Sequence, residues 1–419
     1  MKRKVVLTGT GIVSPLGIGS AVSFARAVDG HSGIRAVTLF DAAAFPTRIA
    51  GEAADYDPNA HFNIKEQRHL TRFQQFALVA AREAVKESGL TMSSEDTYRV
   101  GVMIGSGIGS LQILEEQRDL LRDKGPRRVS PFLTTGMIIN EAPARVAIEL
   151  GAKGPNFSAV TACASGAHSI GFAIRAIQYG DADVVVAGGT EAAICPIGFA
   201  GFCSLRAMSV RNDEPTRASR PFSAARDGFV MGEGAGILVL EELEHARRRG
   251  ANILAEAAGY GATADAYHVT APDPAGDAGA HCMELAMRDA GLTPGDIGYI
   301  NAHGTSTQLN DPIETVIIKK ALGEHAQRVA VSSTKSVTGH MIGAAGAVGY
   351  IFSALVVKNG VLPPTINLDD QDPACDLDCV PNHSRTAAIG AALCNSFGFG
   401  GHNACLAVRK YRENMFGGE

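Results

Sequence analysis

One cysteine stands in a sequence setting that could support covalent catalysis. Cys163 lies in the segment TACASG at residues 161–166, where a short strand-like stretch turns into a helix predicted over residues 164–179. The free N–H groups and the dipole at a helix N-terminus favour a thiolate. They can lower the pKa of a thiol from about 8.5 to about 3.5–7.5. The alternative is a buried cysteine that acts as a small apolar side chain. The turn position and the small neighbouring residues favour a nucleophile.

Two histidines stand in settings that could assist such a nucleophile. His303 follows a predicted buried strand, in the segment NAHGTST at residues 301–307, and His340 ends the segment KSVTGH in front of a long apolar helix. Catalytic groups of α/β folds commonly lie at the ends of strands, and a helix N-terminus keeps an imidazole neutral. Each histidine alone could be a structural residue. Together with Cys163 they predict thiolate chemistry that uses two neutral imidazoles.

The elements that must position these side chains alternate between buried strands and helices. Strands are predicted at residues 5–8, 99–106, 183–189, 235–241, 253–260, 299–303, 329–335, 392–396 and 404–408, with a turn at Gly9 and Gly11. Helices are predicted at residues 66–89, 140–150, 164–179, 278–291, 311–322 and 340–358. This alternation predicts an α/β protein.

The two halves of the chain repeat one pattern of a strand, a helix rich in glycine and alanine, and a buried strand. The helix after Cys163 ends at Tyr179-Gly180, and the helix after His340 ends at Asn359-Gly360. Such self-similarity indicates an internal duplication. We therefore expect an N-terminal half over residues 1–252, a C-terminal half over residues 253–411 and a flexible tail over residues 412–419.

Composition narrows the classes of function. A net charge of −5 over 419 residues gives no reason to expect a nucleic-acid partner. Eight cysteines without a Cys-x-x-Cys pair predict reduced thiols, a cytoplasmic protein and no metal site. The Gly9-x-Gly11 pair lacks the third glycine of a dinucleotide site. Residues 341–357 are uncharged, but their many glycines and alanines favour a buried central helix over a membrane span.

Four segments resemble motifs of the β-ketoacyl-acyl carrier protein synthases, and most closely the type II elongating enzyme of bacterial fatty acid synthesis. They are TACASG at 161–166, NAHGTST at 301–307, KSVTGH at 335–340 and NSFGFGG at 395–401, in the order of the family. The resemblance covers residues from about Arg3 to Val408. It implies a thiolase-like fold, in which two duplicated α/β halves stack in five layers, αβαβα, and a homodimer.

The resemblance also implies the reaction. Cys163 would take an acyl chain from acyl carrier protein as a thioester, and malonyl-acyl carrier protein would lose carbon dioxide. The resulting carbanion would attack the thioester and give a 3-oxoacyl chain two carbons longer. His303 and His340 would donate hydrogen bonds to the malonyl thioester oxygen, and the N–H groups of Cys163 and Phe399 would form the oxyanion hole. The phosphopantetheine arrives with the substrates, so no bound cofactor is expected.

By the same resemblance, further residues fall into groups with distinct roles. The acyl-pocket positions are Ile108 and Phe202, with Phe399 as a gate. The positions that bind the pantetheine arm are Thr270, Thr305 and Thr307. Lys335, Asp311 and Glu314 form a charged network behind the histidines, which can also be a structural ion-pair network. A basic patch for the acidic carrier, or else a solvated charged face, is predicted from Lys65, Arg68, Arg72, Arg127, Arg128 and Arg206.

Several related functions stay open at this point. Initiating synthases pair the cysteine with histidine and asparagine, and thiolases use a second cysteine, so two histidines argue against both. A polyketide-type ketosynthase is an alternative, and so is a partner subunit with weakened condensing activity, although Cys163 argues against a subunit without a nucleophile.

One position departs from the family pattern. Most relatives carry a glutamate where this chain has Gly349, and that glutamate normally pairs with the lysine that matches Lys335. We expect condensation below the rate that the family site allows, because a buried ammonium without its partner is costly.

Overall fold

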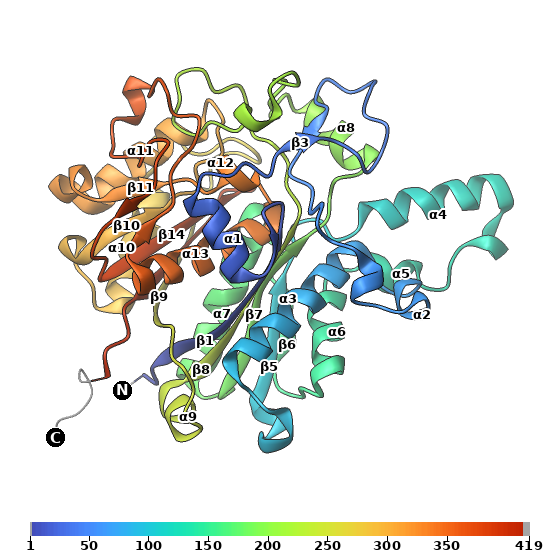
Figure 1. Cartoon of the computed structure of the whole chain (residues 1–419), viewed down its shortest axis with the longest axis horizontal. Coiled ribbons are helices and arrows are strands. Elements are labelled where there is room, and N and C mark those ends of the chain that lie inside the picture. Colours follow the sequence, from blue (N-terminus) through green and yellow to red (C-terminus); the bar gives the residue numbers. More distant parts are fainter. Residues whose placement is uncertain (1, 414–419) are drawn as a thin grey trace.

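One continuous sheet carries the same strand order twice. Within residues 2–413, which the computed structural model describes, eleven strands form this sheet (Figure 1). The order in the first half is β1 (Val5–Ser14), β8 (Gly234–Glu242), β7 (Val184–Glu191), β5 (Val100–Gly105) and β6 (Asn156–Phe157). The order in the second half is β9 (Ala255–Ala264), β15 (His402–Arg409), β14 (Ala391–Gly398), β10 (Ile297–Asn301) and β11 (Ala330–Ser332).

The directions of the strands repeat as well. In each half the first two pairings are antiparallel and the next two are parallel. The half-sheets join where β1 pairs with β9 through Val6–Glu256 and Leu7–Ala255. The eleventh strand, β2 (Gly17–Ile18), pairs only with β1. The duplication that the sequence predicts is confirmed by this repeated topology.

Helices complete the five layers. The two half-sheets enclose α7 (Ser165–Tyr179) and α13 (Ala345–Asn359), which contact each other and strands of both halves. Helices α3 (Arg72–Ser88) and α6 (Glu141–Leu150) cover the outer face of the first half-sheet. Helices α10 (Asp277–Ala290) and α11 (Asn310–Leu322) lie on the outer side of the second half. The predicted αβαβα arrangement is confirmed.

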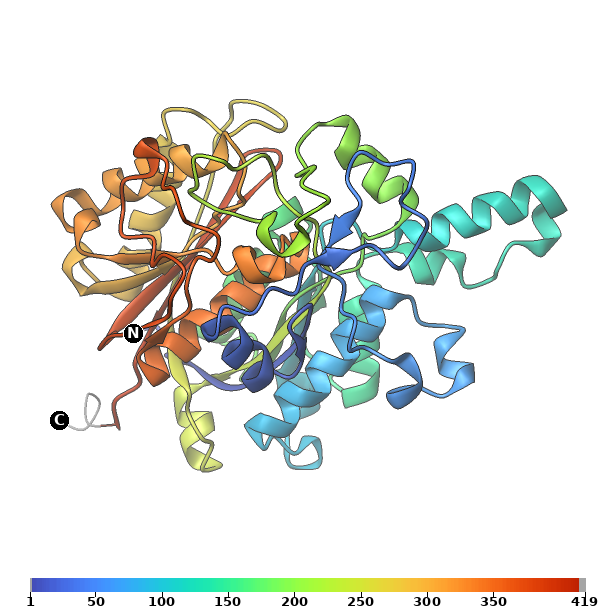
Figure 2. The same ribbon diagram turned by 45° about the horizontal axis from the view of Figure 1, so that its top comes forward.

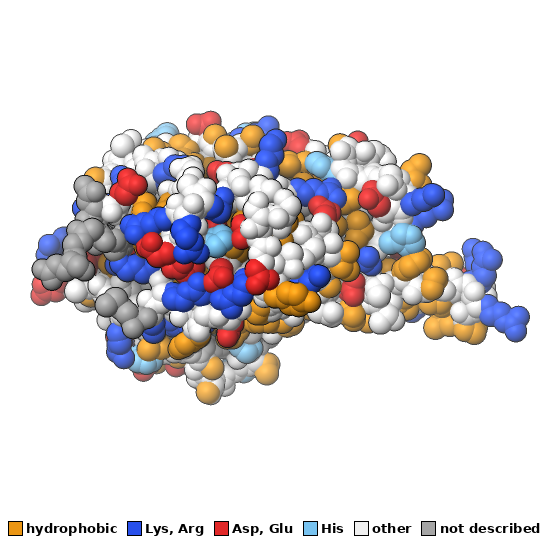
Figure 3. Space-filling model, turned by 90° about the horizontal axis from the view of Figure 1, so that it is seen from below, with side chains coloured by type: hydrophobic (Ala, Val, Ile, Leu, Met, Phe, Trp, Pro, Cys, Tyr) orange, Lys and Arg blue, Asp and Glu red, His pale blue; other side chains and the backbone are white. Residues whose placement is uncertain are grey.

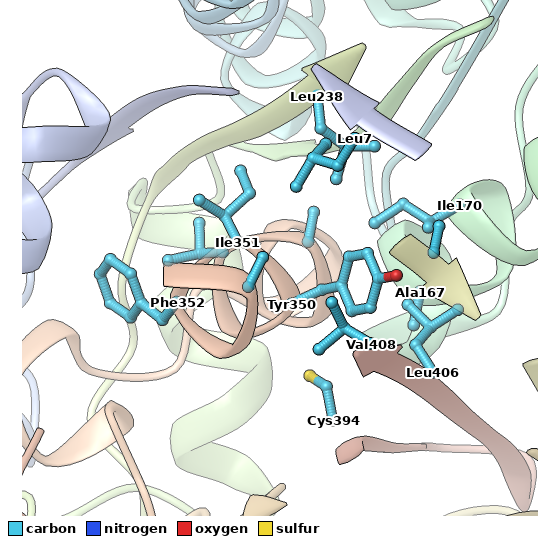
Figure 4. Packing of buried hydrophobic residues seen from close by; sticks show 14 of the residues in the cluster. Leu7, Ala167, Ile170, Leu238, Tyr350, Ile351, Phe352, Cys394, Leu406 and Val408 are labelled. Carbon is cyan, nitrogen blue, oxygen red and sulfur yellow. The ribbon is translucent and has the colours of Figure 1, made fainter. Parts of the chain in front are cut away.

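Helix α13 forms the centre of the main apolar core. Its side chains Tyr350, Ile351 and Phe352 pack against Leu238 of β8 and Leu406 of β15, among others (Figure 4). Among the described residues, the stretch Ile342–Asn359 alone is long and apolar enough to cross a membrane, and 78% of it is buried inside the protein. Burial explains its composition, because an interior helix has no polar face.

The first strand differs from its prediction. We expected a turn at Gly9 and Gly11, but β1 continues through both residues to Ser14. The backbone of α3 lies so close there that a Cβ atom would overlap the carbonyl oxygen of Ala84 at Gly9 and that of Ala80 at Gly11. The two glycines therefore permit close helix–sheet packing and do not break the strand.

The helix predicted over residues 66–89 is divided in two. Helix α2 (Ile64–Gln67) ends early, and α3 begins after Thr71, which forms a capping box with Gln74. Helix α4 (Leu111–Lys124) projects from the body as an arm and is followed by the 3₁₀ turn η4 (Pro126–Arg128) (Figures 1 and 2). The predicted tail lies outside the described residues from position 414 onward.

Short elements complete the chain. They are α1 (Ser20–Val28), β3 (Arg35–Ala36), β4 (Ile49–Ala50), α5 (Leu133–Met137), α8 (Pro196–Ser204), α9 (Leu243–Arg248), α12 (Lys335–Thr338), β12 (Val361–Leu362) and β13 (Arg385–Thr386). Two 3₁₀ turns precede the central helices, η5 (Ala162–Ala164) before α7 and η9 (Ile342–Ala344) before α13.

Candidate active site

Cys163 lies in a tight elbow between a loop and the central helix α7. The preceding residue, Ala162, has a left-handed φ of 49°. The hydroxyl of Ser165 donates to the Ala162 carbonyl at 2.7 Å and accepts from the Thr161 N–H at 2.9 Å, which fixes the turn. A Cβ atom on Gly166 would lie 2.7 Å from the Gly343 carbonyl oxygen, so only glycine fits where the second elbow approaches. The small residues around Cys163 therefore serve packing as well as access.

The elbow opens into a cavity of about 470 Å³. Nine of the residues predicted for the site line this cavity: Cys163, Phe202, Arg206, Thr270, His303, Thr305, Thr307, His340 and Phe399. They come from both halves of the chain. Ile108 does not line the cavity but packs in an apolar cluster with Cys163 and Phe202.

The Cys163 thiol does not have the lowered pKa that its helix position predicts. Burial raises the pKa of Cys163 to about 12, more than the Lys335 ammonium and the N–H groups of Phe399 and of Cys163 itself can lower it. The carboxylate of Glu191 adds to the rise. Desolvation outweighs the helix N-terminus, so the free thiol is neutral at pH 7.

His303 and His340 face each other within the cavity. Their ring centroids are 5.4 Å apart and the rings are nearly perpendicular. Each side chain is almost fully buried, at 4% exposure. Burial first, and then the Lys335 ammonium, hold the pKa of both imidazoles well below the ordinary value of 6.5. Both rings are therefore neutral at pH 7.

The predicted reason for the neutrality of His340 is wrong. Helix α13 begins only at Ala345, five residues later, so His340 is not at its first turn. The main chain of His340 instead bridges to the segment around Met231, and its N–H donates to the Val230 carbonyl at 2.7 Å. Its Nδ1 atom is buried and has no hydrogen-bond partner among the described residues.

A buried carboxylate holds the loop that carries His303. Glu314 of α11 accepts the N–H of His303 at 2.7 Å and the N–H of Gly304 at 2.6 Å. The side-chain amide of Asn395 donates to the same carboxylate at 3.2 Å. Burial raises the pKa of Glu314, and these donors oppose the rise.

Lys335 and Asp311, which the resemblance assigns to a charged network behind the histidines, are both buried. The Lys335 Nζ atom donates to the Ala302 carbonyl at 3.4 Å, and burial lowers the pKa of this lysine against the opposing charge of Glu314. Asp311 accepts the Phe222 N–H at 2.9 Å and lies 3.9 Å from the Arg226 guanidinium. The network fixes backbone as much as it pairs charges.

The predicted basic residues do not gather on one segment. Lys65 lies in α2, Arg68 just after it, and Arg206 after α8 at the cavity. Arg127 and Arg128 lie in η4, beyond the end of the arm α4, where Figure 3 shows Lys and Arg side chains at the outer end of the molecule. All five side chains are exposed.

Arg72 differs from these five. Its guanidinium binds the Glu233 carboxylate through two hydrogen bonds of 2.5 and 2.8 Å, and the Glu233 side chain is only 1% exposed. Arg72 therefore belongs to a buried ion pair, and the expectation that it is a free docking cation does not fit the structure.

Several residues near the site were missed by sequence reasoning. The ring of Phe397 lies edge-on to His303 at 5.6 Å, and Phe229 packs edge-on against His340 at 5.6 Å. Glu191 ends the buried strand β7 and lies beside Cys163. Two of them carried a signal in the sequence: Phe397 lies inside the motif NSFGFGG, and Glu191 is an acidic residue that ends an otherwise uncharged strand.

Comparison with known proteins gives consistent matches. The family models "Beta-ketoacyl synthase, N-terminal domain" and "Beta-ketoacyl synthase, C-terminal domain" match residues 2–246 and 254–369. The chain is 50% identical over 409 residues to a 3-oxoacyl-[acyl-carrier-protein] synthase 2 of Coxiella burnetii, which covers 98% of this chain and 99% of that protein. It is 49% identical over 411 residues to the protein of the same name from Synechocystis, with the same coverage.

Solved structures of ketosynthases are similar to this chain over nearly its whole length. One is a type II PKS acyl-carrier protein in complex with its ketosynthase bound to the hexaketide, with a TM-score of 0.91 and 36% identity over 98% of this chain and all of that one. Another is a β-ketoacyl synthase from Burkholderia phymatum, with a TM-score of 0.91 and 35% identity over the same coverage.

Proposed function

Because the chain belongs to the β-ketoacyl synthase family, we propose that it catalyses the decarboxylating condensation of an acyl chain with malonyl-acyl carrier protein in fatty acid elongation. One observation carries the proposal: a cysteine at a helix elbow and two neutral imidazoles share one cavity. This combination suits a reaction that needs both a nucleophile and uncharged hydrogen-bond donors.

In the first step, the Cys163 sulfur attacks the thioester carbonyl of the acyl carrier. The carbon–sulfur bond to the pantetheine breaks, the carrier leaves as a thiol, and the proton of Cys163 passes to the leaving sulfur. The N–H groups of Cys163 and Phe399, which lie close enough to the sulfur to lower its pKa, stabilise the oxyanion in this proposal. Phe399 is 36% exposed in the loop between β14 and β15, and its ring lies 6.4 Å from that of Phe202, which supports a role as a gate.

In the second step, malonyl-acyl carrier protein enters the same cavity. The neutral rings of His303 and His340 each donate one N–H to its thioester oxygen, which stabilises the enolate that forms as carbon dioxide leaves. The enolate carbon attacks the acyl thioester on Cys163, the carbon–sulfur bond breaks, and the thiol returns after it takes up a proton. The hydroxyls of Thr270, Thr305 and Thr307 line the route of the pantetheine arm.

We propose an apolar site for the acyl chain beside Cys163. Cys163 and Ile108 pack against a cluster of apolar side chains that includes Phe229 and Ile342, and Phe202 packs against the same cluster. Such an apolar surface beside the nucleophile suits a hydrocarbon tail.

We also propose the partners and the compartment. Acyl carrier protein is the expected carrier, because the five exposed basic side chains described above can attract an acidic protein although the net charge of the chain is −5. A homodimer is expected, because within residues 2–413 the edge strand β6 has no partner strand on one side. This strand carries exposed Phe157, with Val160 and Phe172 exposed nearby. Eight free cysteines suit a reducing compartment such as the cytoplasm.

A polyketide-type ketosynthase is the second candidate. Its support is the close likeness to the ketosynthase bound to a hexaketide, at 36% identity. The 50% identity to fatty acid enzymes favours the first proposal. A product profile with purified carriers loaded from short to long chains separates the two: saturated 3-oxoacyl products support the first, and poly-β-keto products support the second.

The nucleophile can be tested directly. After incubation with acyl-acyl carrier protein, mass spectrometry should find the acyl group on the peptide that contains Cys163. Cys163→Ala should accept no acyl chain and still decarboxylate malonyl-acyl carrier protein through the histidines. Label on another cysteine, or unchanged condensation by Cys163→Ala, would contradict the proposal.

A further inference from the structure

Glu191 is a fully buried carboxylate whose hydrogen-bonding capacity is taken up by four donors. One oxygen, Oε1, accepts the Ser106 hydroxyl at 2.8 Å and the Ile108 N–H at 3.2 Å. The other oxygen, Oε2, accepts the Gly107 N–H at 2.8 Å and the Gly343 N–H at 3.0 Å. All four donors point at oxygen, so a carboxylate fits this site and an amide does not. Burial raises the pKa of Glu191 to about 7, and the four donors oppose the rise.

The four donors come from two segments far apart in the chain. Three belong to the loop after β5, and Gly343 belongs to η9 in front of α13. Glu191 itself ends β7, the neighbour of β5. Its carboxylate therefore ties one loop of the first half to the elbow of the second half.

The internal duplication explains why this elbow can take a carboxylate. In both halves a residue with left-handed φ opens the 3₁₀ turn, Ala162 at 49° and Ile342 at 45°. The residue that follows is Cys163 in the first half and Gly343 in the second. The N–H of Gly343 donates to Glu191, and its counterpart in the first elbow is the N–H of Cys163. The second elbow is thus a copy of the first in which a carboxylate occupies the anion position.

The loop that Glu191 holds is part of the wall around Cys163. A Cβ atom on Gly107 would lie 3.1 Å from the Ala162 carbonyl oxygen, so this loop contacts the nucleophile elbow. The next residue, Ile108, packs in the apolar cluster with Cys163 and Phe202. Any movement of the Glu191 carboxylate would move both.

We propose that Glu191 is a positioning residue for the loading of the acyl chain onto Cys163. It fixes the position of Ile108 relative to the elbow that carries Cys163. In this way it sets both the rate of acyl transfer and the shape of the acyl site. It does not hold the His303 loop, which is fixed by a different carboxylate, Glu314. The main chain of His340 is held separately, by its N–H bond to the Val230 carbonyl. This inference rests on the proposed function, since it assumes that Cys163 accepts an acyl chain.

The test compares the two half-reactions in Glu191→Gln. The amide would turn its NH₂ group toward two N–H or O–H donors, so the loop should shift. We expect acyl transfer from the carrier to Cys163 to fall on the order of 10- to 100-fold, and the preference among short, medium and long chains to change. Decarboxylation of malonyl-acyl carrier protein should change by less than about threefold. A matched control is Glu241→Gln, another fully buried carboxylate on the neighbouring strand β8, which should leave the chain-length preference unchanged.

Ser106→Ala keeps the test decisive if Glu191→Gln does not fold. It removes one donor to Oε1 and should shift acyl transfer and chain-length preference in the same direction by a few fold. Equal losses in both half-reactions, or an unchanged chain-length profile with unchanged transfer, would overturn the proposal. If the wild-type enzyme itself loads no acyl chain on Cys163, the proposed function fails instead, so the two failures are distinguishable.

Discussion

The imidazole of His303 stands at 88° to that of His340, with 5.4 Å between the ring centroids. Two neutral rings at this angle can direct one N–H each toward a single oxygen between them. Burial holds the pKa of both imidazoles well below 6.5, so neither ring carries a positive charge at pH 7. The arrangement is therefore suited to an enolate that forms and disappears within one turnover.

Replacing either histidine should slow the malonyl step most. We expect His303→Ala and His340→Ala to lower decarboxylation of malonyl-acyl carrier protein by about 10²–10⁴, the usual effect of removing a positioned donor. Loss of carbon dioxide from labelled malonyl groups gives the rate. His325→Ala is a control, because His325 bonds to the Ile297 carbonyl in the outer layer. Wild-type rates in both site variants would assign the histidines a structural role.

The raised pKa of Cys163 predicts how the free enzyme reacts with an alkylating agent. Because burial moves this pKa to about 12, the thiolate fraction grows about tenfold for each pH unit between pH 7 and pH 9. The rate of labelling of the Cys163 peptide by iodoacetamide should rise accordingly, without a plateau. A plateau near neutral pH would mean that the helix N-terminus outweighs burial.

The exposed cations should act on carrier-bound substrates alone. Charge reversal at Arg68 and at Arg128 should raise KM for acyl-acyl carrier protein and leave KM for a small acyl thioester unchanged, because only the acidic protein meets these surfaces. Equal losses with both substrates would exclude a docking role.

Arg72 provides the contrast for that experiment. Arg72→Met should leave Glu233 buried without its partner and reduce stability by about 3–5 kcal/mol. Thermal unfolding measures the loss. An Arg72→Met variant with an unchanged Tm and a raised KM for the carrier would show that Arg72 binds the carrier and is not needed for stability.

Gly349 tests whether the missing glutamate limits the rate. A Cβ atom at this position would lie 2.8 Å from Asn301 Oδ1 and 3.1 Å from Cys394 Sγ, so any side chain must displace Asn301. Gly349→Ala has the same crowding without a carboxylate and is the matched control. We expect Gly349→Glu to condense faster than Gly349→Ala and than the wild type, because a carboxylate would stabilise the buried Lys335 ammonium, whose pKa is now lowered. Equal rates for Glu and Ala variants of equal Tm would show that the carboxylate is dispensable.

Much of the fold could be predicted because local patterns and tertiary packing agree. The helix after Cys163 ends at Gly180 and the central C-terminal helix at Gly360, as predicted, and both glycines have the left-handed φ of a helix end. The prediction of a turn at Gly9 and Gly11 was wrong because these glycines are required by the close approach of α3, which lies some seventy residues away in the sequence. No local window contains that contact.

The candidate site, like the fold, could be predicted from the sequence only in part. Motif spacing identified the residues that line the cavity, but not the pKa of Cys163, which depends on how much of the protein surrounds it. The role of Glu191 could not be predicted for a related reason, since its four donors lie 83 or more positions away along the chain. Sequence shows that a carboxylate is present there, and only the fold shows what it holds.

The pairing of β1 with β8 has a consequence for synthesis of the protein. Val5 pairs with Glu242, so the first strand leaves the ribosome long before its partner is translated. At about 5–20 residues per second, the delay is roughly 10–50 s. During this time an apolar strand has both edges open, a state that invites pairing with other nascent chains. Chaperones that bind extended apolar segments should therefore bind β1 during this interval, before His303 and His340 have been made.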